Sequence, residues 1–437
     1  MPGFRDFYPD EFAARAFIID RWRDVARRFG FVEYDGPPLE PLELYTRKSG
    51  EEIVGQLYNF VDKGGREVAL RPEMTPTFAR MVAARANALR KPVRWFSVPQ
   101  LFRYERQQKG RLREHFQLNV DIVGESDTLA DAELLAVAIE IMRELGLTAA
   151  DVRARVSDRR LFTALLDAIG VTEAQRPAAY AVVDKMTRMS AADALQKLAE
   201  AGIAPAAARR VAEVVEVRTL DALPADLLAT PMVAEQVARV RQYLANLDAL
   251  GVGEWVDLDL RIVRGLAYYT GTVFELFDAR GELRAICGGG RYDTLLKALG
   301  GVDLPALGFG MGDVVLAELL RERGLLRAEV PASDYWVVAD EGAPLAEVLR
   351  AASALRRRGL SVEHPLNATK LATQKTRAQL QAAQKAGATR ALVVRADGTG
   401  EIRTLGDDAA EPIVVRLDEL AAPGAVGDPA ADLAPTS

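Results

Sequence analysis

A long helical stretch lies between two groups of predicted strands, and this arrangement limits the folds open to the chain. Residues 158–250 are rich in Ala, Leu and Arg and repeat apolar residues at helical spacing, with few strand signals. Strand signals occur on both sides of this stretch, at 93–104, 116–123, 255–263, 272–278 and 283–287. The pattern therefore predicts a sheet whose strands come from both sides of a helical insertion.

Shorter patterns define the rest of the N-terminal part. Amphipathic spacing and turn residues predict helices over 11–29, 76–90 and 127–145, and strands over 57–61 and 67–70. Two glycine-rich stretches are expected to be turns, GGGR at 288–291 and GFGMG at 308–312, the second leading from a strand into a helix.

A smaller α/β unit is predicted at the C-terminal end. Residues 322–333 are expected to form the linker to it. Its predicted strands are YWVVA, SVEH, ALVVRA, EIRTL and PIVVRL, with helices over 344–358 and 370–386. The tail from Ala421 is rich in Ala, Pro, Gly and Asp and is expected to be disordered.

Composition excludes several classes of protein. The 437 residues are 49% hydrophobic and 27% charged, as is usual for a soluble protein, and no apolar run approaches the roughly 20 residues of a membrane-spanning helix. The charged N-terminus lacks a signal-peptide core, so a cytoplasmic enzyme is expected. A net charge of −6 argues against nucleic-acid binding over the whole surface, but it allows a local basic site.

Cysteine and histidine are scarce in this chain. Cys287 is the one cysteine, and His115 and His364 are the two histidines. One thiol cannot form an internal disulfide, and these three residues disfavour both a zinc site and a Ser/His or Cys/His nucleophile. Cys287 is expected to be a small buried residue. The chemistry should therefore depend on charge and positioning, with no zinc and no organic cofactor.

The segment FRYERQQKGRLREHF, residues 102–116, concentrates positive charge. Its basic residues are Arg103, Arg106, Lys109, Arg111 and Arg113, and its acidic residues are Glu105 and Glu114. Arginines fixed on a strand, loop and strand would hold phosphate oxygens bidentately. A solvated hairpin loop is the alternative interpretation.

Three other segments carry candidate binding groups. In RIVRGLAYYTG, Arg264 lies in an apolar context before two tyrosines, so it requires an anionic ligand or a buried protein partner. In LRPEMT, Glu73 could hold a substrate ammonium, or Glu73 and Thr75 could instead favour a helix N-terminus. The glycines of GGGRYD and GFGMG allow close approach of a ligand, or mark plain turns, and neither segment matches a P-loop or GxGxxG.

Taken in this order, the segments resemble the histidyl-tRNA synthetase family from about residue 3 to 420. GFVEYDGPPLE resembles class II motif 1, whose proline, here Pro37, lies at the dimer interface. FRYERQQKGRLREHFQLNVDIVG resembles motif 2, RGLAYYTG and GGGRYD resemble the two histidine signatures, and GFGMGDVVL resembles motif 3. The resemblance implies an α+β class II catalytic domain, an antiparallel sheet flanked by helices, over 1–325. It also implies the helical insertion at 158–250 and an anticodon-binding-like α/β domain at 332–420, before the tail 421–437.

The resemblance also implies roles for matching residues. Arg103 would contact the α-phosphate of ATP, and Arg264 would stabilise its charge as the histidine carboxylate attacks. Histidine would be bound by Glu73, Thr75, Gln117, Asp121, Tyr268 and Tyr269. ATP would be contacted by Arg103, Glu105, Arg111, Arg113, His115 and Phe116, and the tRNA acceptor end by Arg106, Gln107 and Gln108. The implied partners are L-histidine, ATP with its Mg²⁺, tRNA(His) and a second copy of the chain.

Three positions depart from the family pattern. Val315 stands where motif 3 has an arginine that packs on adenine and meets the γ-phosphate. His115 stands where motif 2 has an aromatic residue that stacks on adenine, and Ala267 replaces an acidic residue. These changes bear on nucleotide affinity and leave Arg103 and Arg264 in place.

Two alternative functions share this resemblance. The regulatory subunit of ATP phosphoribosyltransferase resembles the same catalytic fold, but it usually lacks the arginine at position 264 and the C-terminal domain, both of which this chain has. A class II synthetase for proline or threonine would lack the paired signatures at 264–269 and 288–293. The sequence therefore favours histidine–tRNA ligation.

Overall fold

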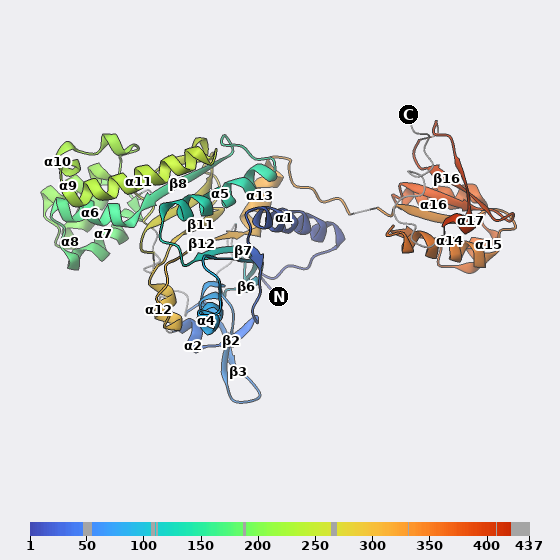
Figure 1. Cartoon of the computed structure of the whole chain (residues 1–437), viewed down its shortest axis with the longest axis horizontal. Helices are drawn as coiled ribbons and strands as arrows, with labels where there is room; N and C mark the ends of the chain where they lie inside the picture. Colours follow the sequence, from blue (N-terminus) through green and yellow to red (C-terminus); the bar gives the residue numbers. More distant parts are fainter. Residues whose placement is uncertain are drawn as a thin grey trace. The chain divides into compact units, whose positions relative to one another are not determined.

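The computed structural model of the chain (Figure 1) describes residues 1–46, 55–105, 110, 112–186, 189–263, 269–330, 332–407 and 409–420. The chain forms two compact units, Met1–Glu329 and Val330–Ser437, and the division falls within the segment 322–333 that was expected to be a linker. Outside the described residues lie the tail 421–437 and six candidate site residues, namely Arg106, Gln107, Gln108, Arg111, Arg264 and Tyr268.

A large sheet organises the first unit. Within the described ranges it has nine strands in the order β1-β5-β7-β12-β11-β10-β8-β9, with β6 paired to β7. The strands are β1 (Val32–Glu33), β5 (Val93–Ser97), β6 (Gln100–Phe102), β7 (Glu114–Val123), β8 (Val152–Asp158), β9 (Val256–Leu258), β10 (Thr272–Asp278), β11 (Cys287–Arg291) and β12 (Ala306–Gly312). All neighbours are antiparallel except β1 with β5 and β8 with β9. With its flanking helices, this sheet confirms the expected class II fold.

The two glycine-rich stretches are strands, so the prediction of turns at 288–291 and 308–312 was wrong. Both lie in the middle of the sheet, where β11 pairs with β12 and β12 pairs with β7. A Cβ on Gly289 would lie 2.5 Å from the carbonyl oxygen of Gly308, and a Cβ on Gly308 would lie 2.8 Å from that of Val120. Glycine is therefore required here because neighbouring main chain leaves no room for a side chain.

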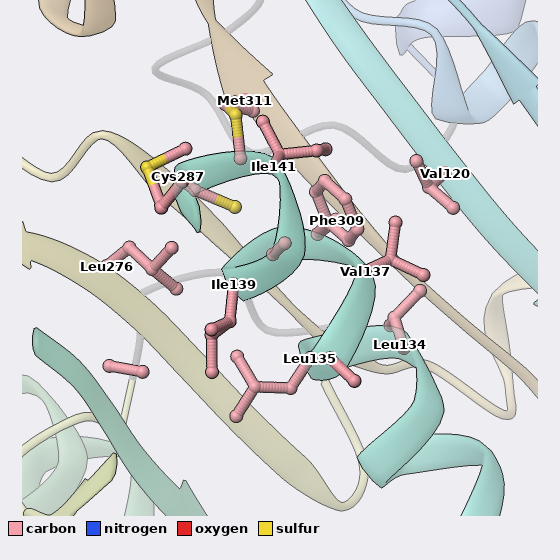
Figure 2. Close-up of a cluster of buried hydrophobic side chains, with 14 of the residues drawn as sticks. Val120, Leu134, Leu135, Val137, Ile139, Ile141, Leu276, Cys287, Phe309 and Met311 are labelled. Atoms are coloured by element: carbon pink, nitrogen blue, oxygen red, sulfur yellow. The ribbon is translucent and has the colours of Figure 1, made fainter. Parts of the chain in front are cut away.

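Three helices cover one face of the sheet, namely α1 (Pro9–Arg28), α5 (Thr128–Glu144) and α13 (Asp313–Glu322). Helix α5 is apolar on nearly every side, and Figure 2 shows Val137 and Ile141 of α5 beside Phe309 and Met311 of the sheet. Cys287 is buried in this core, as expected. Burial of each such aliphatic side chain stabilises the folded state by about 1.5–3 kcal/mol.

Other short elements pack at the opposite face. A three-stranded sheet has the order β2-β4-β3, with β2 at Leu39–Pro41, β3 at Tyr58–Val61 and β4 at Glu67–Leu70. The helices are α2 (Glu43–Thr46), α4 (Thr75–Arg85) and α12 (Leu295–Gly300). Helices α4 and α12 pack together through a core that includes Phe78 and Leu296. Helix α4 ends five residues before the predicted limit at 90.

The helical stretch begins directly after β8 and returns the chain to β9. Its helices are α6 (Arg159–Ile169), α7 (Arg176–Val183), α8 (Ala191–Glu200), α9 (Pro205–Val214), α10 (Ala225–Leu228) and α11 (Pro231–Ala249). Single 3-10 turns occur at η1 (Glu173–Gln175), η3 (Leu220–Ala222) and η4 (Gly253–Trp255). Helix α11 packs against α5 and α6, so the stretch is joined to the covered face of the large sheet.

The second unit is a sheet of order β14-β13-β15-β16-β17 with helices beside it. Its elements are β13 (Tyr335–Ala339), α14 (Leu345–Arg357), β14 (Val362–Glu363), α15 (Ala368–Thr373), α16 (Thr376–Lys385), β15 (Arg390–Val394), β16 (Thr399–Thr404), β17 (Ile413–Arg416) and α17 (Leu417–Leu420). The single helix predicted over 370–386 is two helices, because the chain is extended at Gln374 and Lys375. Among the residues that can be described, no helix is long and apolar enough to cross a membrane.

Candidate active site

A cleft of about 930 Å³ opens on the face of the large sheet opposite α5. Eight of the candidate site residues line it together. They are Glu73, Thr75, Arg103, Glu105, His115, Gln117, Asp121 and Tyr269. These residues come from three distant parts of the chain, so the fold brings together groups that the sequence presents separately.

Alternation along β7 decides which of its side chains face the cleft. His115, Gln117 and Asp121 line it, whereas Phe116 points to the other face. There the Phe116 ring lies 6.3 Å from the ring of Phe7 and beneath the guanidinium of Arg15, at 4.4 Å. The expectation that Phe116 contacts ATP is therefore wrong, since a strand turns adjacent side chains to opposite faces.

The floor of the cleft is largely main chain. Gly308, Gly310 and Gly312 of β12 face the cleft in alternation with Phe309 and Met311, whose side chains enter the core. The period-two pattern of GFGMG was a strand signal that the glycine content obscured. Gly308 and Gly310 leave room for the side chains of Asp121 and Gln117, because a Cβ on Gly308 would collide with Asp121 Oδ1 and one on Gly310 would lie 2.9 Å from Gln117 Cδ, whereas a Cβ on Gly312 would meet nothing within 4 Å.

A buried carboxyl and a phenol form one polar group in the cleft. The Tyr292 hydroxyl donates to Oδ1 of Asp121, and both side chains are almost fully buried. Burial raises the pKa of Asp121 from its usual 3.8 to about 7, although the bond from Tyr292 opposes this shift. Tyr292 was absent from the candidate residues, and its position in GGGRYD was the signal for it.

A second polar group surrounds Arg103. Its Nε donates to the carbonyl oxygen of Pro72 at 2.9 Å, which fixes the guanidinium beside the start of α4. Burial raises the pKa of Glu73, and the charge of Arg103 partly opposes this. Burial, with Arg103 and Arg5, lowers the pKa of His115 to about 3, so His115 is neutral at physiological pH.

The alternative of helix capping does not account for Glu73 and Thr75. Met74 occupies the N-cap position of α4 and makes no side-chain capping bond, and Thr75 is the first helical residue. Both Glu73 and Thr75 line the cleft instead. Arg113 lies apart from them, with its guanidinium 4.3 Å from the Tyr104 ring and its Nε bonded to the carbonyl oxygen of Glu105 at 3.3 Å.

An N-terminal arginine ties two walls of the site together. Arg5 donates from Nε to Glu114 at 2.6 Å and from Nη1 to Asp313 at 2.8 Å. Asp313 also accepts a bond from the backbone N–H of Phe116 at 2.9 Å. Strand β7 and the start of α13 are thus held by one cation, a contact across about three hundred residues that no local motif could reveal.

A second cleft-lining arginine, Arg284, was also missed. It precedes β11 and lines the cleft together with Val315, the position where the family pattern has an arginine. A Cβ on Gly110 would lie 3.4 Å from Val315 and 3.8 Å from Cδ of Arg284. Arg103 and Arg284 are the cations among the described lining residues, which also include several carboxylates. In the same part of the chain, no cluster of His, Cys, Asp and Glu could hold a metal ion.

Comparison with known proteins identifies the family. The family model described as histidyl-tRNA synthetase matches residues 3–313. A histidine–tRNA ligase of Opitutus terrae is 48% identical over 370 residues, which are 84% of this chain and 84% of that protein. One from Halobacterium salinarum is 42% identical over 422 residues, 94% of this chain and 95% of that protein.

A solved structure agrees in fold. The histidyl-tRNA synthetase of Nostoc sp. PCC 7120 superposes with a TM-score of 0.79 over 96% of both chains, at 24% identity. A likeness at this identity concerns the fold, whereas the sequence relatives carry the assignment. On the family match over residues 3–313 and these relatives, the chain belongs to the histidyl-tRNA synthetase family.

Proposed function

We propose that the cleft above the glycine strands is where this chain, a histidine–tRNA ligase, joins L-histidine to the α-phosphate of ATP. The observation that carries this proposal is that one cleft brings together residues from distant parts of the chain, namely Glu73, Thr75, Arg103, His115, Gln117, Asp121, Tyr269 and Tyr292, above the glycines of β12. A cleft of about 930 Å³ gives room for two substrates to lie side by side. The family assignment supplies the reaction, and the cleft supplies the candidate residues.

The pair of Asp121 and Tyr292 suits the imidazole of histidine. A neutral imidazole has one N–H donor and one acceptor nitrogen, which a carboxyl and a hydroxyl group can satisfy. An amino acid without these nitrogens would leave buried polar groups unpaired, at a cost that gives strong discrimination. Gln117 and Tyr269 extend this wall, and Glu73 and Thr75 provide acceptors for the α-ammonium group.

The region of Arg103 suits the phosphates of ATP. Arg103 would meet the α-phosphate, and Arg284 would add the positive charge that a triphosphate needs near Val315. Neutral His115 offers a flat uncharged ring to adenine, with Glu105 beside it. By resemblance, Arg111, Arg113 and Arg264 would also act on ATP, and Mg²⁺ would arrive bound to its β- and γ-phosphates.

The chemistry requires no protein nucleophile. A histidine carboxylate oxygen attacks the α-phosphorus, and pyrophosphate leaves on the opposite side. A ribose hydroxyl of tRNA(His) then attacks the carbonyl carbon, and AMP leaves. Arg103 can stabilise the charge that gathers on the phosphorus oxygens, and the fixed pocket supplies orientation. Arg106, Gln107 and Gln108 would meet the tRNA acceptor end, and residues 332–420 would bind the anticodon.

Assembly and location follow from the same resemblance. GFVEYDGPPLE matches the motif whose proline lies at the dimer interface, so we expect a homodimer with Pro37 in its contact surface. Light scattering coupled to size exclusion would give the mass of the particle, and a monomer at micromolar concentration would contradict the expectation.

The enzyme is expected to work in the cytoplasm, where tRNA is charged.

An ATP–pyrophosphate exchange assay with each of the twenty amino acids tests the proposal directly. Exchange should depend on L-histidine, and the product should load onto tRNA(His). Exchange with another amino acid alone would reassign the substrate. No exchange, together with tight binding to a phosphoribosyltransferase, would favour the regulatory-subunit alternative.

A further inference from the structure

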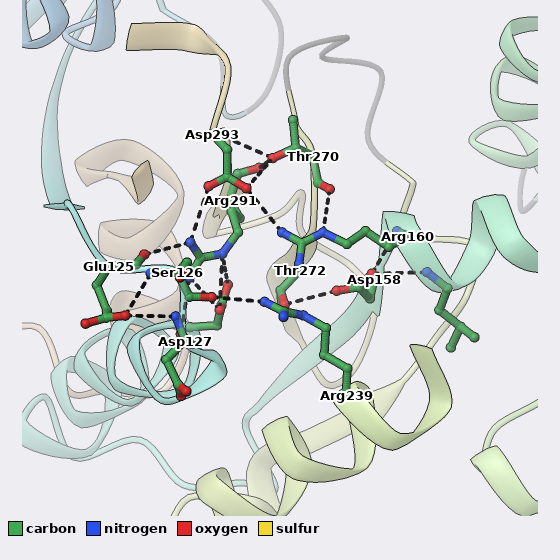
Figure 3. Close-up of polar contacts among 12 residues, drawn as sticks. Glu125, Ser126, Asp127, Asp158, Arg160, Arg239, Thr270, Thr272, Arg291 and Asp293 are labelled. Atoms are coloured by element: carbon green, nitrogen blue, oxygen red, sulfur yellow. Dashed lines mark hydrogen bonds and ion pairs between the residues drawn. The ribbon is translucent and has the colours of Figure 1, made fainter. Parts of the chain in front are cut away.

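We propose that Arg160, the second residue of helix α6, is a positioning residue for the histidine pocket. It does not line the cleft, and it belongs to the helical stretch rather than to any of the recognised motifs. Figure 3 shows its guanidinium between Thr270 and Asp293. This inference rests on the proposed histidine pocket.

Arg160 bridges two segments, at Thr270 and Asp293, that are both more than a hundred residues away from it in sequence. Its Nε donates to the carbonyl oxygen of Thr270 at 3.1 Å, and its Nη2 donates to Oδ2 of Asp293 at 3.1 Å. The two segments are also bonded to each other, because the Asp293 backbone N–H donates to Thr270 Oγ1 at 3.0 Å and Thr270 Oγ1 donates to Asp293 Oδ2 at 3.2 Å. Arg160 therefore closes a compact ring of hydrogen bonds.

Each anchored residue is the direct neighbour of a cleft tyrosine. Tyr269 precedes Thr270, and Tyr292 precedes Asp293. Both tyrosines are buried, and Tyr292 donates to Asp121. A shift of the main chain at Thr270 or Asp293 would therefore move a hydroxyl group in the pocket.

A second guanidinium fixes the other side of Asp293. Arg291 has no exposed surface and is held by Asp131, with its Nη2 2.7 Å from Oδ2, and by the carbonyl oxygen of Glu125 at 2.8 Å. It also donates from Nη1 to Asp293 Oδ1 at 3.3 Å. Asp293 thus lies between one arginine anchored on the sheet core and one on the helical stretch.

The space for this arrangement is provided by Gly271. A Cβ there would lie 2.8 Å from Nη2 of Arg160 and 3.1 Å from Cδ of Arg291. The helix that carries Arg160 is in turn fixed to the sheet, because Asp158 accepts bonds from the Arg160 backbone N–H at 2.7 Å and from Thr272 Oγ1 at 3.3 Å. The helical stretch is therefore mechanically linked to the pocket at this point.

The test compares Arg160→Met with Arg160→Lys and with a matched control, Arg241→Met. Methionine keeps the apolar stem and removes the donors, whereas lysine keeps the charge and part of the bonding. Arg241 is also in the helical stretch, and it pairs at the surface with Asp221. For each protein, the KM values for histidine and ATP come from pyrophosphate exchange, the Kd for histidine from calorimetry, and the Tm from thermal unfolding.

We expect Arg160→Met to raise the KM and Kd for histidine about tenfold, since misplacement by a fraction of an ångström is costly at a fitted site. The KM for ATP should stay within about twofold, Arg160→Lys should recover part of the loss, and Arg241→Met should resemble the wild type. Equal rises in both KM values, or an unchanged histidine Kd, would overturn the inference.

Other results separate this inference from the proposed function. A wild-type chain without histidine-dependent exchange would remove the proposed function itself, whatever the variants do. If Arg160→Met does not fold, Arg160→Lys provides the measurement. A wild-type histidine Kd in a folded lysine variant would then count against Arg160, because a single ammonium group cannot reproduce both bonds.

Discussion

Replacing Asp121 by Asn should flatten the dependence of stability on pH in the ligand-free chain. Asn keeps an acceptor oxygen for the Tyr292 hydroxyl, so the main change is the loss of an ionisable group in a buried place. In the folded chain the Asp121 carboxyl has a pKa of about 7, compared with its usual 3.8. The folded state therefore holds this proton over a pH interval in which the unfolded chain has released it.

The size of the effect follows from that difference. Because the folded state binds more protons between these two pKa values, the free energy of unfolding falls as the pH rises from about 4 to about 7. A pKa difference of about three, at about 1.4 kcal/mol each, amounts to about 4 kcal/mol over the full interval. Between about pH 5 and 8 the expected loss is about 3 kcal/mol in the wild type and none from this site in the variant.

Urea unfolding at a series of pH values measures this difference. The chain has four tryptophans, of which Trp336 lies in the second unit, so Trp336→Phe in both proteins makes the fluorescence report on the first unit. His115 has a lowered pKa and gives a slope of opposite sign below pH 6.5, but it is present in both proteins and cancels in the difference.

Parallel plots of the free energy of unfolding against pH for the two proteins would contradict this prediction. If the free energies of unfolding of Asp121→Asn and its parent differ by a constant amount from pH 5 to pH 8, the carboxyl is not desolvated in the free chain. A parent protein that lost stability relative to Asp121→Asn as the pH fell would be equally contrary, since that would require a folded-state pKa below the usual value.

Three further predictions concern a central glycine of the sheet and the cations of the cleft. Gly289→Ala should lower the free energy of unfolding by about 3 kcal/mol or more, because its Cβ meets main chain in a central strand, and a urea midpoint equal to that of the wild type would contradict this. Arg103→Met should lower kcat of pyrophosphate exchange about 100-fold or more with a nearly unchanged histidine Kd in calorimetry, whereas equal losses would point to a binding role. Arg284→Met should raise the KM for ATP about fivefold and leave the KM for histidine unchanged, and an unaltered ATP KM would remove Arg284 from the site.

Periodic segments were predictable from the sequence. The helix expected over 11–29 is Pro9–Arg28, and the one expected over 127–145 is Thr128–Glu144. Repeated apolar spacing leaves little choice for such segments, since only a helix places those residues on one face. The mostly antiparallel sheet with flanking helices was likewise expected from the resemblance, and it is confirmed.

The central strands were not predictable in the same way. Glycine usually marks turns, and the strand expected over 283–287 begins only at Cys287 and continues through GGGR. Glycine is required there because the carbonyl oxygen of a neighbouring strand leaves no room for a side chain. This contact cannot be inferred from the sequence alone. Local composition therefore gave the wrong element where a tertiary contact decides the conformation.

The candidate site residues were also predictable only in part, because tertiary contacts decide which of them face the cleft. Eight of them share one cleft because the motifs follow strands of one sheet, but Phe116 faces the core because its strand alternates. Arg5 and Arg160 act through partners more than a hundred residues away, so no spacing rule could select them. Contacts of this kind become visible only when the fold is known.

The glycine floor limits how the cleft can change during evolution or design. A position that carries no side chain has nothing left to trim, so substitutions at Gly308, Gly310 or Gly312 cannot deepen the cavity, and at the first two a new Cβ would collide with Asp121 or Gln117. Room for a bulkier amino acid would have to come from the walls, at Gln117, Tyr269 or Tyr292. A library that aims at a larger substrate should therefore randomise the walls and leave the floor untouched.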